Sequence, residues 1–234
     1  MSSIKCRNLC KTFHQGQETI TGLDQVSLEI ASGEFVCLSG PSGSGKTTLL
    51  NAMGGLDTPD SGEILLGEER IDLLAKGALA DLRLHRIGFV FQAYNLIPVL
   101  TARENIEFVM QIQGLHAAER HQRARAILEE VGLEGIEDRR PAQLSGGQQQ
   151  RVAVARAIVS QPSLVLADEP TANLDSHAAT HLMQLFLDLN LQHGVTFVIA
   201  THDEGVMAYA RRLIRMRDGR IVSDESRQAG SAAS

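Results

Sequence analysis

The stretch "GPSGSGKT", Gly40 to Thr47, constrains the fold of this chain more than any other feature. It follows the apolar run "FVCLS", which is typical of a buried strand, and precedes a helix expected to begin at Lys46. The pattern fits GxxxxGK(S/T) in the strand–loop–helix context that this motif requires. Its glycines let backbone amides point at phosphate oxygens, Lys46 can reach those oxygens, and Thr47 can ligate Mg²⁺. The sequence therefore predicts a phosphate-binding loop made of Gly40, Pro41, Ser42, Gly43, Ser44, Gly45, Lys46, Thr47 and Thr48.

Strands and helices alternate along the rest of the chain. Apolar or alternating runs predict strands at 26–30, 35–40, 61–67, 86–92, 163–169 and 195–203. Helical patterns are expected from Lys46, across 101–130 and across 181–190. This alternation predicts an α/β fold with a mainly parallel sheet covered on both faces, and ligands in such folds bind at the carboxyl ends of the strands.

We expect one domain over residues 1–222 with one helical insertion. The core is predicted at 1–92 and 161–222, and the insertion at 93–160, where Ala, Arg, Glu and Gln become frequent. The segment "LIRMRDGRIV" predicts a hairpin whose Asp218-Gly219 pair suits a type I′ turn. Residues 223–234 are small and polar, which predicts a disordered tail.

Polar residues follow three of the predicted strands. Asp168 closes "SLVLAD", where a carboxylate can hold Mg²⁺, and the adjacent Glu169 could polarise the water that attacks a terminal phosphate. Gln92 ends "GFVFQ", and His202 follows "TFVIAT". Each residue alone is equally well explained as the polar end of a strand. Together with the phosphate-binding loop they predict a nucleotide hydrolysis site.

A second glycine-rich helix start lies at "LSGGQQQR", Leu144 to Arg151. Ser145 and Gln148 have the spacing of a capping box, which satisfies amides of the first helical turn. The capping box does not explain Gly146 and Gly147, because each glycine weakens a helix by about 1 kcal/mol relative to alanine. The two glycines therefore indicate a function that requires a backbone without side chains at this position.

The composition of the chain indicates which partners and which cellular compartment to expect. A formal net charge of −6 argues against a nucleic-acid partner. The three cysteines lack metal-like spacing, and an odd number fits a reduced compartment. His177 and His181 have helical spacing without an evident third metal ligand, so we interpret them as surface residues. No apolar run reaches the length of about 20 residues that a membrane helix needs, so we expect a cytosolic chain.

The segments "GPSGSGKT", "LSGGQQQRVAVARA", "ADEPTANLD" and "ATHD" occur in this order. In that order they resemble the nucleotide-binding subunit of ATP-binding cassette (ABC) transporters over nearly the whole chain. The resemblance implies a P-loop NTPase with a RecA-like core, an N-terminal antiparallel β-subdomain and an inserted helical subdomain. It also implies ATP and Mg²⁺ as ligands and a homodimer with ATP between the subunits.

The same resemblance assigns roles to individual residues. It makes Glu169, His202, Lys46 and Gln92 catalytic, with Glu169 as the base and His202 on the γ-phosphate, and it puts Thr47, Gln92 and Asp168 at the metal. Ser145, Gly146, Gly147 and Gln148 would close over ATP held by the other subunit, with Asp175 in a loop that crosses the interface. Phe13 matches the aromatic residue that stacks on adenine. The glycine usual in the family is replaced by Ala172.

Within the family, "MGGLDTPDSGEI" and "FVFQAYNLIPVLTARENI" resemble the lipoprotein-releasing (LolD-like) and macrolide-exporter (MacB-like) group. That implies an ATPase that powers a separate integral membrane permease from the cytoplasmic face of the inner membrane, for export or extraction of an envelope substrate. Segment 93–110 would receive the permease, although its apolar residues Leu96, Ile97, Val99 and Leu100 also fit ordinary core. The alternative is a non-transport ABC ATPase that acts mechanically on an envelope complex. An ABC protein of translation or DNA repair is disfavoured by the single cassette and the acidic balance.

Overall fold

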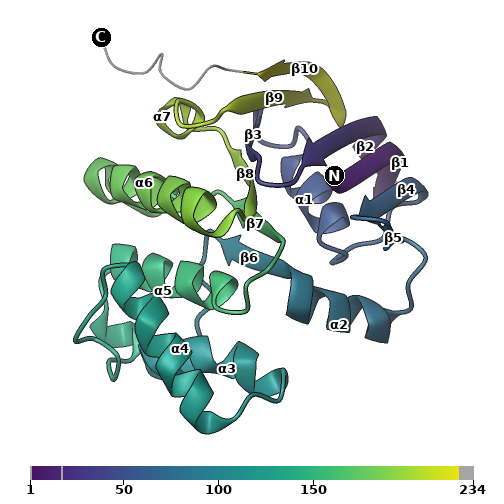
Figure 1. Ribbon diagram of the computed structural model, residues 1–234. Helices are drawn as coiled ribbons and strands as arrows, with labels where there is room; N and C mark the ends of the chain where they lie inside the picture. The colour runs from purple at the N-terminus through teal and green to yellow at the C-terminus, as the bar shows by residue number, and fades with distance from the viewer. Residues whose placement is uncertain (1, 17, 227–234) are drawn as a thin grey trace.

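The computed structural model describes residues 2–16 and 18–226, which fold around two sheets (Figure 1). The larger sheet has six strands in the order β10-β9-β3-β8-β7-β6. Its strands are β3 (Phe35–Ser39), β6 (Ile87–Phe91), β7 (Leu164–Asp168), β8 (Thr196–Thr201), β9 (Arg212–Arg217) and β10 (Arg220–Ser226). Every pairing from β9 to β6 is parallel, and only β10 pairs antiparallel. The predicted mainly parallel sheet is confirmed.

Successive residues of these strands enter two different cores. In β3, Phe35 belongs to the core beneath the α3–α6 helices, whereas Val36 and Leu38 belong to the core shared with the smaller sheet. In β8, Phe197 belongs to the first of these cores and Val198 to the second. Because side chains alternate across a strand, a sheet buried on both faces requires continuous apolar runs. The runs "FVCLS" and "TFVIAT" meet that requirement.

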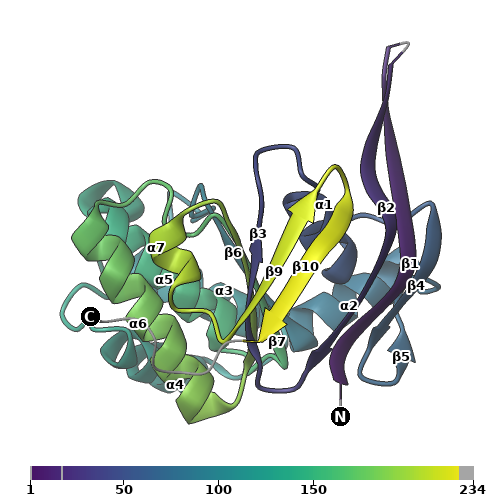
Figure 2. The ribbon, with the colours of Figure 1, turned by 90° about the horizontal axis from the view of Figure 1, so that it is seen from above.

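The smaller sheet is antiparallel, with strand order β2-β1-β4-β5. Its strands are β1 (Ser2–Gln15), β2 (Glu18–Ala31), β4 (Ser61–Leu66) and β5 (Glu69–Arg70). The hairpin of β1 and β2 extends well beyond the rest of the molecule (Figure 2). The N-terminal antiparallel subdomain implied by the family resemblance is therefore present.

Seven α-helices surround the sheets in the described residues: α1 (Lys46–Met53), α2 (Lys76–Arg86), α3 (Ala102–Ile112), α4 (Ala117–Glu130), α5 (Gly146–Ile158), α6 (Ser176–His193) and α7 (Glu204–Met207). The predicted insertion 93–160 contains α3, α4 and α5, grouped together in Figure 1, and the short 3₁₀-helix Pro141–Gln143. α5 also packs on the sheet, since a Cβ added to Gly88 of β6 would lie 2.4 Å from the carbonyl oxygen of Ala157. The sequence patterns do not identify α2.

The C-terminal hairpin forms as predicted but continues further. Asp218 and Gly219 have φ angles of 51° and 75°, as a type I′ turn requires. Strand β10 runs to Ser226, so the prediction that the disordered tail begins at 223 is wrong for residues 223–226. The reason is cross-strand charge pairing, because Arg212 bonds Asp224 at 2.7 Å and Arg215 bonds Glu225 at 2.9 Å. The remaining residues, 227–234, lie outside the described part of the chain.

Candidate active site

The phosphate-binding loop connects the carboxyl end of β3 to the start of α1. Gly45 is the N-cap of α1, with φ of 101° and no side-chain cap. Lys46 lies over the loop, where its Nζ donates to the carbonyl oxygens of Gly40 at 2.7 Å and Pro41 at 3.1 Å. Uncapped amides at a helix N-terminus and a nearby ammonium group together favour an anion. The loop therefore has the donors that a polyphosphate needs.

The backbone of this loop lies in close contact with two neighbouring segments. A Cβ at Gly40 would lie 2.3 Å from the carbonyl oxygen of Met216, and one at Gly45 would lie 2.5 Å from that of Gly22. Neither position has room for any residue but glycine. The Oγ of Ser44 is buried and has no hydrogen-bond partner within residues 2–16 and 18–226, as expected of a donor that serves a ligand.

Thr47 and Asp168 meet beside the loop. The Thr47 hydroxyl contacts both carboxylate oxygens of Asp168, at 3.1 and 2.9 Å. Burial raises the pKa of Asp168, and the adjacent Glu169 carboxylate adds to this, while the bond from Thr47 and the charge of Lys46 oppose it. Two hard oxygen donors at a site that disfavours bare negative charge fit a divalent cation such as Mg²⁺. No cluster of three or more His, Cys, Asp or Glu residues suited to a metal occurs in the described ranges.

Glu169 is held in one position by the end of β8. Its Oε1 lies 2.8 Å from Nδ1 of His202, and its Oε2 accepts a hydrogen bond of 3.1 Å from Thr201. Its backbone N–H donates to the carbonyl oxygen of Ala200 at 2.9 Å. The φ angle of Glu169 is 44°, a left-handed conformation that costs on the order of 1–3 kcal/mol for a residue with a side chain. Such strain, next to Asp168, is typical of a functional position.

Gln92 reaches the same edge of the sheet from β6. The strand pairing sets Phe91 opposite Asp168, and Gln92 follows directly. Asn173 donates through Nδ2 to the carbonyl oxygen of Gln92 at 2.9 Å, which links this position to the segment after Glu169. Lys46, Thr47, Gln92, Asp168, Glu169 and His202 thus all lie at one edge of the sheet.

Phe13 lies on the β1–β2 hairpin near the start of α1. Its ring is half exposed and rests against Gly22, where an added Cβ would approach Cε2 to 2.6 Å and the Thr48 Cγ2 to 3.1 Å. The ammonium group of Lys11 lies 5.5 Å from the ring centroid. An exposed aromatic ring beside the phosphate-binding loop is suited to stack on a nucleotide base.

The second glycine-rich helix start behaves differently from the first. The predicted capping box forms, since Gln148 N–H donates to Ser145 Oγ at 3.3 Å and Ser145 N–H donates to Gln148 Oε1 at 2.9 Å. A Cβ at Gly146 would lie 2.9 Å from the Tyr94 hydroxyl, whereas one at Gly147 would meet only the Ala178 Cβ at 3.5 Å, an ordinary contact. Its own chain therefore crowds Gly146 but not Gly147.

Asp175 caps the N-terminus of α6 within its own chain. Its carboxylate is the N-cap of α6 and accepts a hydrogen bond of 2.8 Å from the Ala178 N–H. That backbone bond is the main cause of the lowered pKa of Asp175. His177 and His181, predicted as surface residues, are exposed on the first turns of α6 with ring centroids 4.1 Å apart.

Sequence reasoning missed a set of residues that hold the Gln92 segment against α5. Arg156 donates to the carbonyl oxygens of Tyr94 at 3.0 Å and Asn95 at 2.6 Å, and burial lowers its pKa. Tyr94 and Asn95 both have positive φ angles, 56° and 50°. The only signal in the sequence is an arginine inside the apolar run "VAVARAIV", where a charge needs a buried partner.

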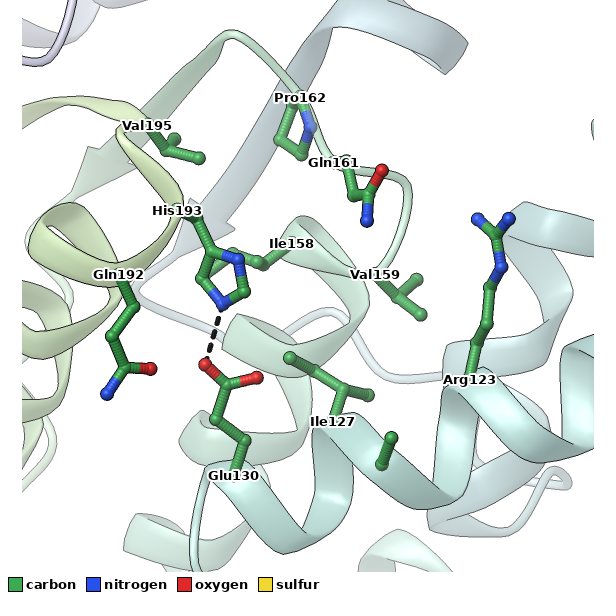
Figure 3. A pocket seen from close by; sticks show the side chains of 11 residues that line it. Arg123, Ile127, Glu130, Ile158, Val159, Gln161, Pro162, Gln192, His193 and Val195 are labelled. Carbon is green, nitrogen blue, oxygen red and sulfur yellow. Dashed lines mark hydrogen bonds and ion pairs between the residues drawn. The ribbon is translucent and has the colours of Figure 1, made fainter.

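Two cavities lie beside helix α5. One of about 580 Å³ lies between α4, α5 and the C-terminal end of α6, and two of its lining residues, His193 and Glu130, pair at 2.6 Å (Figure 3). Its residues precede β7 and β8, so it lies at the sheet edge opposite the phosphate-binding loop. The other, of about 530 Å³ and mainly apolar, lies between α2, β6, α3 and α5, next to Gln92.

The second cavity changes the expectation for segment 93–110. Of that segment only Val109 lines it, together with Leu56, Phe91 and Ile112 from elsewhere. Leu96 packs against the core, and Val99 is exposed. Of the two explanations left open for these apolar residues, ordinary core holds for Leu96. Within residues 2–16 and 18–226, no helix combines the length and apolar character needed to cross a membrane.

Comparison with known proteins agrees with this geometry. The family model described as ABC transporter matches residues 23–172. The macrolide export ATP-binding/permease protein MacB of Brucella melitensis is 47% identical over 225 residues, which are 96% of this chain but 35% of MacB, so the chain spans about a third of that relative. The lipoprotein-releasing system ATP-binding protein LolD of Chromohalobacter salexigens is 42% identical over 94% of this chain and 93% of LolD.

A solved structure has the same fold. The dimeric post-hydrolysis state of the ATP-binding cassette MJ0796, bound to ADP and Pi, superposes with a TM-score of 0.90 at 42% identity, covering 97% of this chain and 100% of that one. With the nucleotide-binding edge described above, these matches show that the chain belongs to the ABC transporter family, as an ATP-hydrolysing cassette.

Proposed function

We propose that this chain binds Mg·ATP at the edge formed by the phosphate-binding loop and the ends of β6, β7 and β8. The loop amides and Lys46 bind the β- and γ-phosphates, and Phe13 stacks on adenine. Glu169 accepts the proton of the water that attacks the γ-phosphorus, and the bond to the β-phosphate oxygen breaks to release ADP and phosphate. The supporting geometry is the 2.8 Å contact of Glu169 with His202 and the bond from Thr201, which orient the carboxylate.

The proposed Mg²⁺ ligands are Thr47 and Asp168, with Gln92 at the end of the neighbouring strand. When bound, the ion neutralises charge on the phosphate oxygens. The raised pKa of Asp168 supports this assignment, because a carboxylate that is costly to ionise in the free chain gains from a cation. His202 lies beyond Glu169 and is proposed to contact the γ-phosphate.

We further propose a head-to-tail homodimer in which Ser145, Gly146, Gly147 and Gln148 of one copy close over ATP bound to the other. The observation that carries this is Gly147, which costs helix stability and is not crowded by its own chain. A helix N-terminus favours an anion, and ATP held by the phosphate-binding loop of a second copy would supply one. The dimeric structure of the similar cassette MJ0796, bound to ADP and Pi, is consistent with this arrangement.

The dimer is tested at Gly147 and Glu169. Gly147→Ala should stabilise the isolated chain by up to about 1 kcal/mol in urea unfolding while lowering ATP turnover, so stability and activity change in opposite directions. Glu169→Gln should bind ATP normally, lose turnover by about 10²–10⁴-fold, and elute as a dimer with Mg·ATP in size-exclusion chromatography. A Gly147→Ala chain with normal turnover would remove the argument for a second copy.

The apolar cavity beside Gln92 is proposed to receive a cytoplasmic segment of an integral membrane permease. Leu56, 47% exposed, and Ile112, 57% exposed, both line this cavity and add exposed apolar surface to it, as a partner site requires. The permease portion named in the MacB relative supports this class of partner. The chain would then act on the cytoplasmic face of the inner membrane, in export or extraction of an envelope substrate.

Capture from membranes tests the partner. The Glu169→Gln variant, trapped with Mg·ATP, should co-purify with a permease identified by mass spectrometry, and the added change Ile112→Glu should remove that permease. Leu191→Glu is a matched control, because Leu191 is 66% exposed on α6 and does not line the cavity. Recovery of soluble partners alone would favour the non-transport ABC ATPase instead.

A further inference from the structure

The turn between β9 and β10 lies directly behind the phosphate-binding loop. The Gly219 N–H donates to the carbonyl oxygen of Ser44 at 3.1 Å, and the Gly219 carbonyl accepts a hydrogen bond of 2.9 Å from the N–H of Asp24. One turn residue therefore bonds the phosphate-binding loop on one side and strand β2 on the other. Both bonds are between backbone atoms, so they depend on how closely the three segments approach.

The lack of a side chain at Gly45 and at Gly219 makes that approach possible, and both approach the backbone of a third glycine, Gly22. A Cβ at Gly45 would lie 2.5 Å from the carbonyl oxygen of Gly22 and 3.3 Å from the Cα of Gly219. A Cβ at Gly219 would lie 3.2 Å from the same Gly22 oxygen. The backbones of β2, the loop and the turn are thus packed together without side chains between them. We call Gly22, Gly45 and Gly219 the glycine junction.

The glycine junction also reaches the aromatic platform. The ring of Phe13 rests on Gly22, where an added Cβ would come within 2.6 Å of Cε2. Beside the glycine junction, Arg220 pairs with Asp24: its Nη2 and Nε lie 2.5 Å and 2.7 Å from the Asp24 Oδ2. Phe13 lies on β1 of the smaller sheet, and the phosphate-binding loop follows β3 of the larger sheet. The two are therefore joined through Gly22, Gly219 and the Asp24–Arg220 pair.

We propose that Gly22, Gly219 and the Asp24–Arg220 pair are positioning residues that fix the spacing between the base platform and the phosphate-binding loop. A nucleotide engages both parts at once, so the second contact is gained at a high effective concentration only if the spacing is already correct. Pyrophosphate engages the loop alone and does not use this spacing. The inference rests on the proposed roles of Phe13 and the loop.

The main test is Gly219→Asn. Asparagine tolerates a left-handed backbone, so the turn is kept, but its Cβ enters the 3.2 Å gap to Gly22. By isothermal titration calorimetry, the dissociation constant for Mg·ADP should rise about tenfold, while that for pyrophosphate stays within about twofold. Gly114→Asn is the matched control, because Gly114 has a φ of 83° with nothing within 4 Å of an added Cβ, and it should change neither constant.

The ion pair gives a smaller, reversible version of the test. Arg220→Gln should weaken Mg·ADP binding by about threefold without affecting pyrophosphate, in line with the modest value of partly exposed pairs, and the exchange of Asp24 and Arg220 should restore binding. Arg215→Gln breaks the comparable Arg215–Glu225 pair on the same hairpin and should have no effect.

The Gly219→Asn result decides the proposal. If this variant weakens the binding of Mg·ADP and of pyrophosphate equally, or changes neither dissociation constant, the proposal is overturned.

Phe13→Ala separates this inference from the proposed function. It should weaken Mg·ADP and leave pyrophosphate unchanged, if Phe13 is the base platform. If Phe13→Ala has this effect and Gly219→Asn does not, the positioning role is wrong and the nucleotide site stands. If Phe13→Ala leaves Mg·ADP binding unchanged, the assignment of the base platform fails, and the positioning proposal fails with it.

Discussion

The chain builds two glycine-rich helix starts and completes them in different ways. At α1 the N-cap is Gly45, no side chain caps the helix, and the surrounding backbone presses on the loop from behind. At α5 the N-cap is Ser145, its capping box is complete, and a Cβ at Gly147 would make only an ordinary contact of 3.5 Å with the Ala178 Cβ. The first start thus has donors to offer within one chain, whereas the second is already satisfied locally and bare on its outer side. Whether a glycine-rich helix start can bind a ligand within one chain therefore depends on the residues that surround it.

The largest expected effect separates the two starts by function. Lys46→Ala should weaken ATP binding to the isolated chain by about 10- to 100-fold, because a charged donor to phosphate is lost. Gly147→Val should leave that binding unchanged but lower turnover by about 10²–10³-fold, as loss of a transition-state contact does. Equilibrium binding of a fluorescent ATP analogue and steady-state phosphate release measure the two quantities. An equal loss of binding in both variants would erase the distinction.

The crowding behind the first start is tested next. Gly40→Ala brings a Cβ within 2.3 Å of the Met216 carbonyl, so the loop or β9 must move. We expect a loss of about 2–4 kcal/mol in the free energy of unfolding. Gly43→Ala is the control, since Gly43 has a positive φ of 80° but nothing within 4 Å, and should lose about 1 kcal/mol. Urea denaturation compares them, and similar losses would show that crowding is unimportant.

The cap of the second start has a smaller expected effect. Ser145→Ala removes the acceptor for the Gln148 N–H and should lower the free energy of unfolding by about 1 kcal/mol. Nucleotide binding to the isolated chain should not change, because Ser145 belongs to the other site. The same urea experiment with and without ATP distinguishes these outcomes, and a loss of ATP-dependent stabilisation would place Ser145 in its own chain's site.

The smallest effect concerns Asp168, next to the first start. Because burial raises the pKa of this carboxyl in the folded chain, its ionisation costs stability once the pH rises above its unfolded-state pKa. Asp168→Asn should therefore raise Tm at neutral pH by about 1–3 °C without nucleotide, and this gain should shrink as the pH falls toward about 4. With Mg·ATP the wild-type chain should have the higher Tm, because its Asp168 carboxylate then has a cation to bind. Differential scanning calorimetry at several pH values checks both signs.

Much of this molecule follows from local sequence patterns. The phosphate-binding loop, the Ser145–Gln148 capping box and the Asp218-Gly219 turn each depend on neighbouring residues, and all three form as predicted. The strand ends at Asp168 and His202 are also predictable, because parallel strands bring their carboxyl ends to one edge. Helix α2 escapes prediction because its pattern is weakly apolar, with only Leu79 and Leu82 buried.

The sequence alone predicts the kind of chemistry and the edge of the sheet at which it occurs, because these depend on short motifs and on strand direction. The folded chain is needed to tell which glycine of the second helix start is crowded, since the atom closest to a Cβ at Gly146 belongs to Tyr94, far away in the sequence. The contact of Gly219 with Ser44 in the phosphate-binding loop likewise appears only in the folded chain, because residues 175 positions apart leave no local pattern. Close backbone packing is a property of the folded chain.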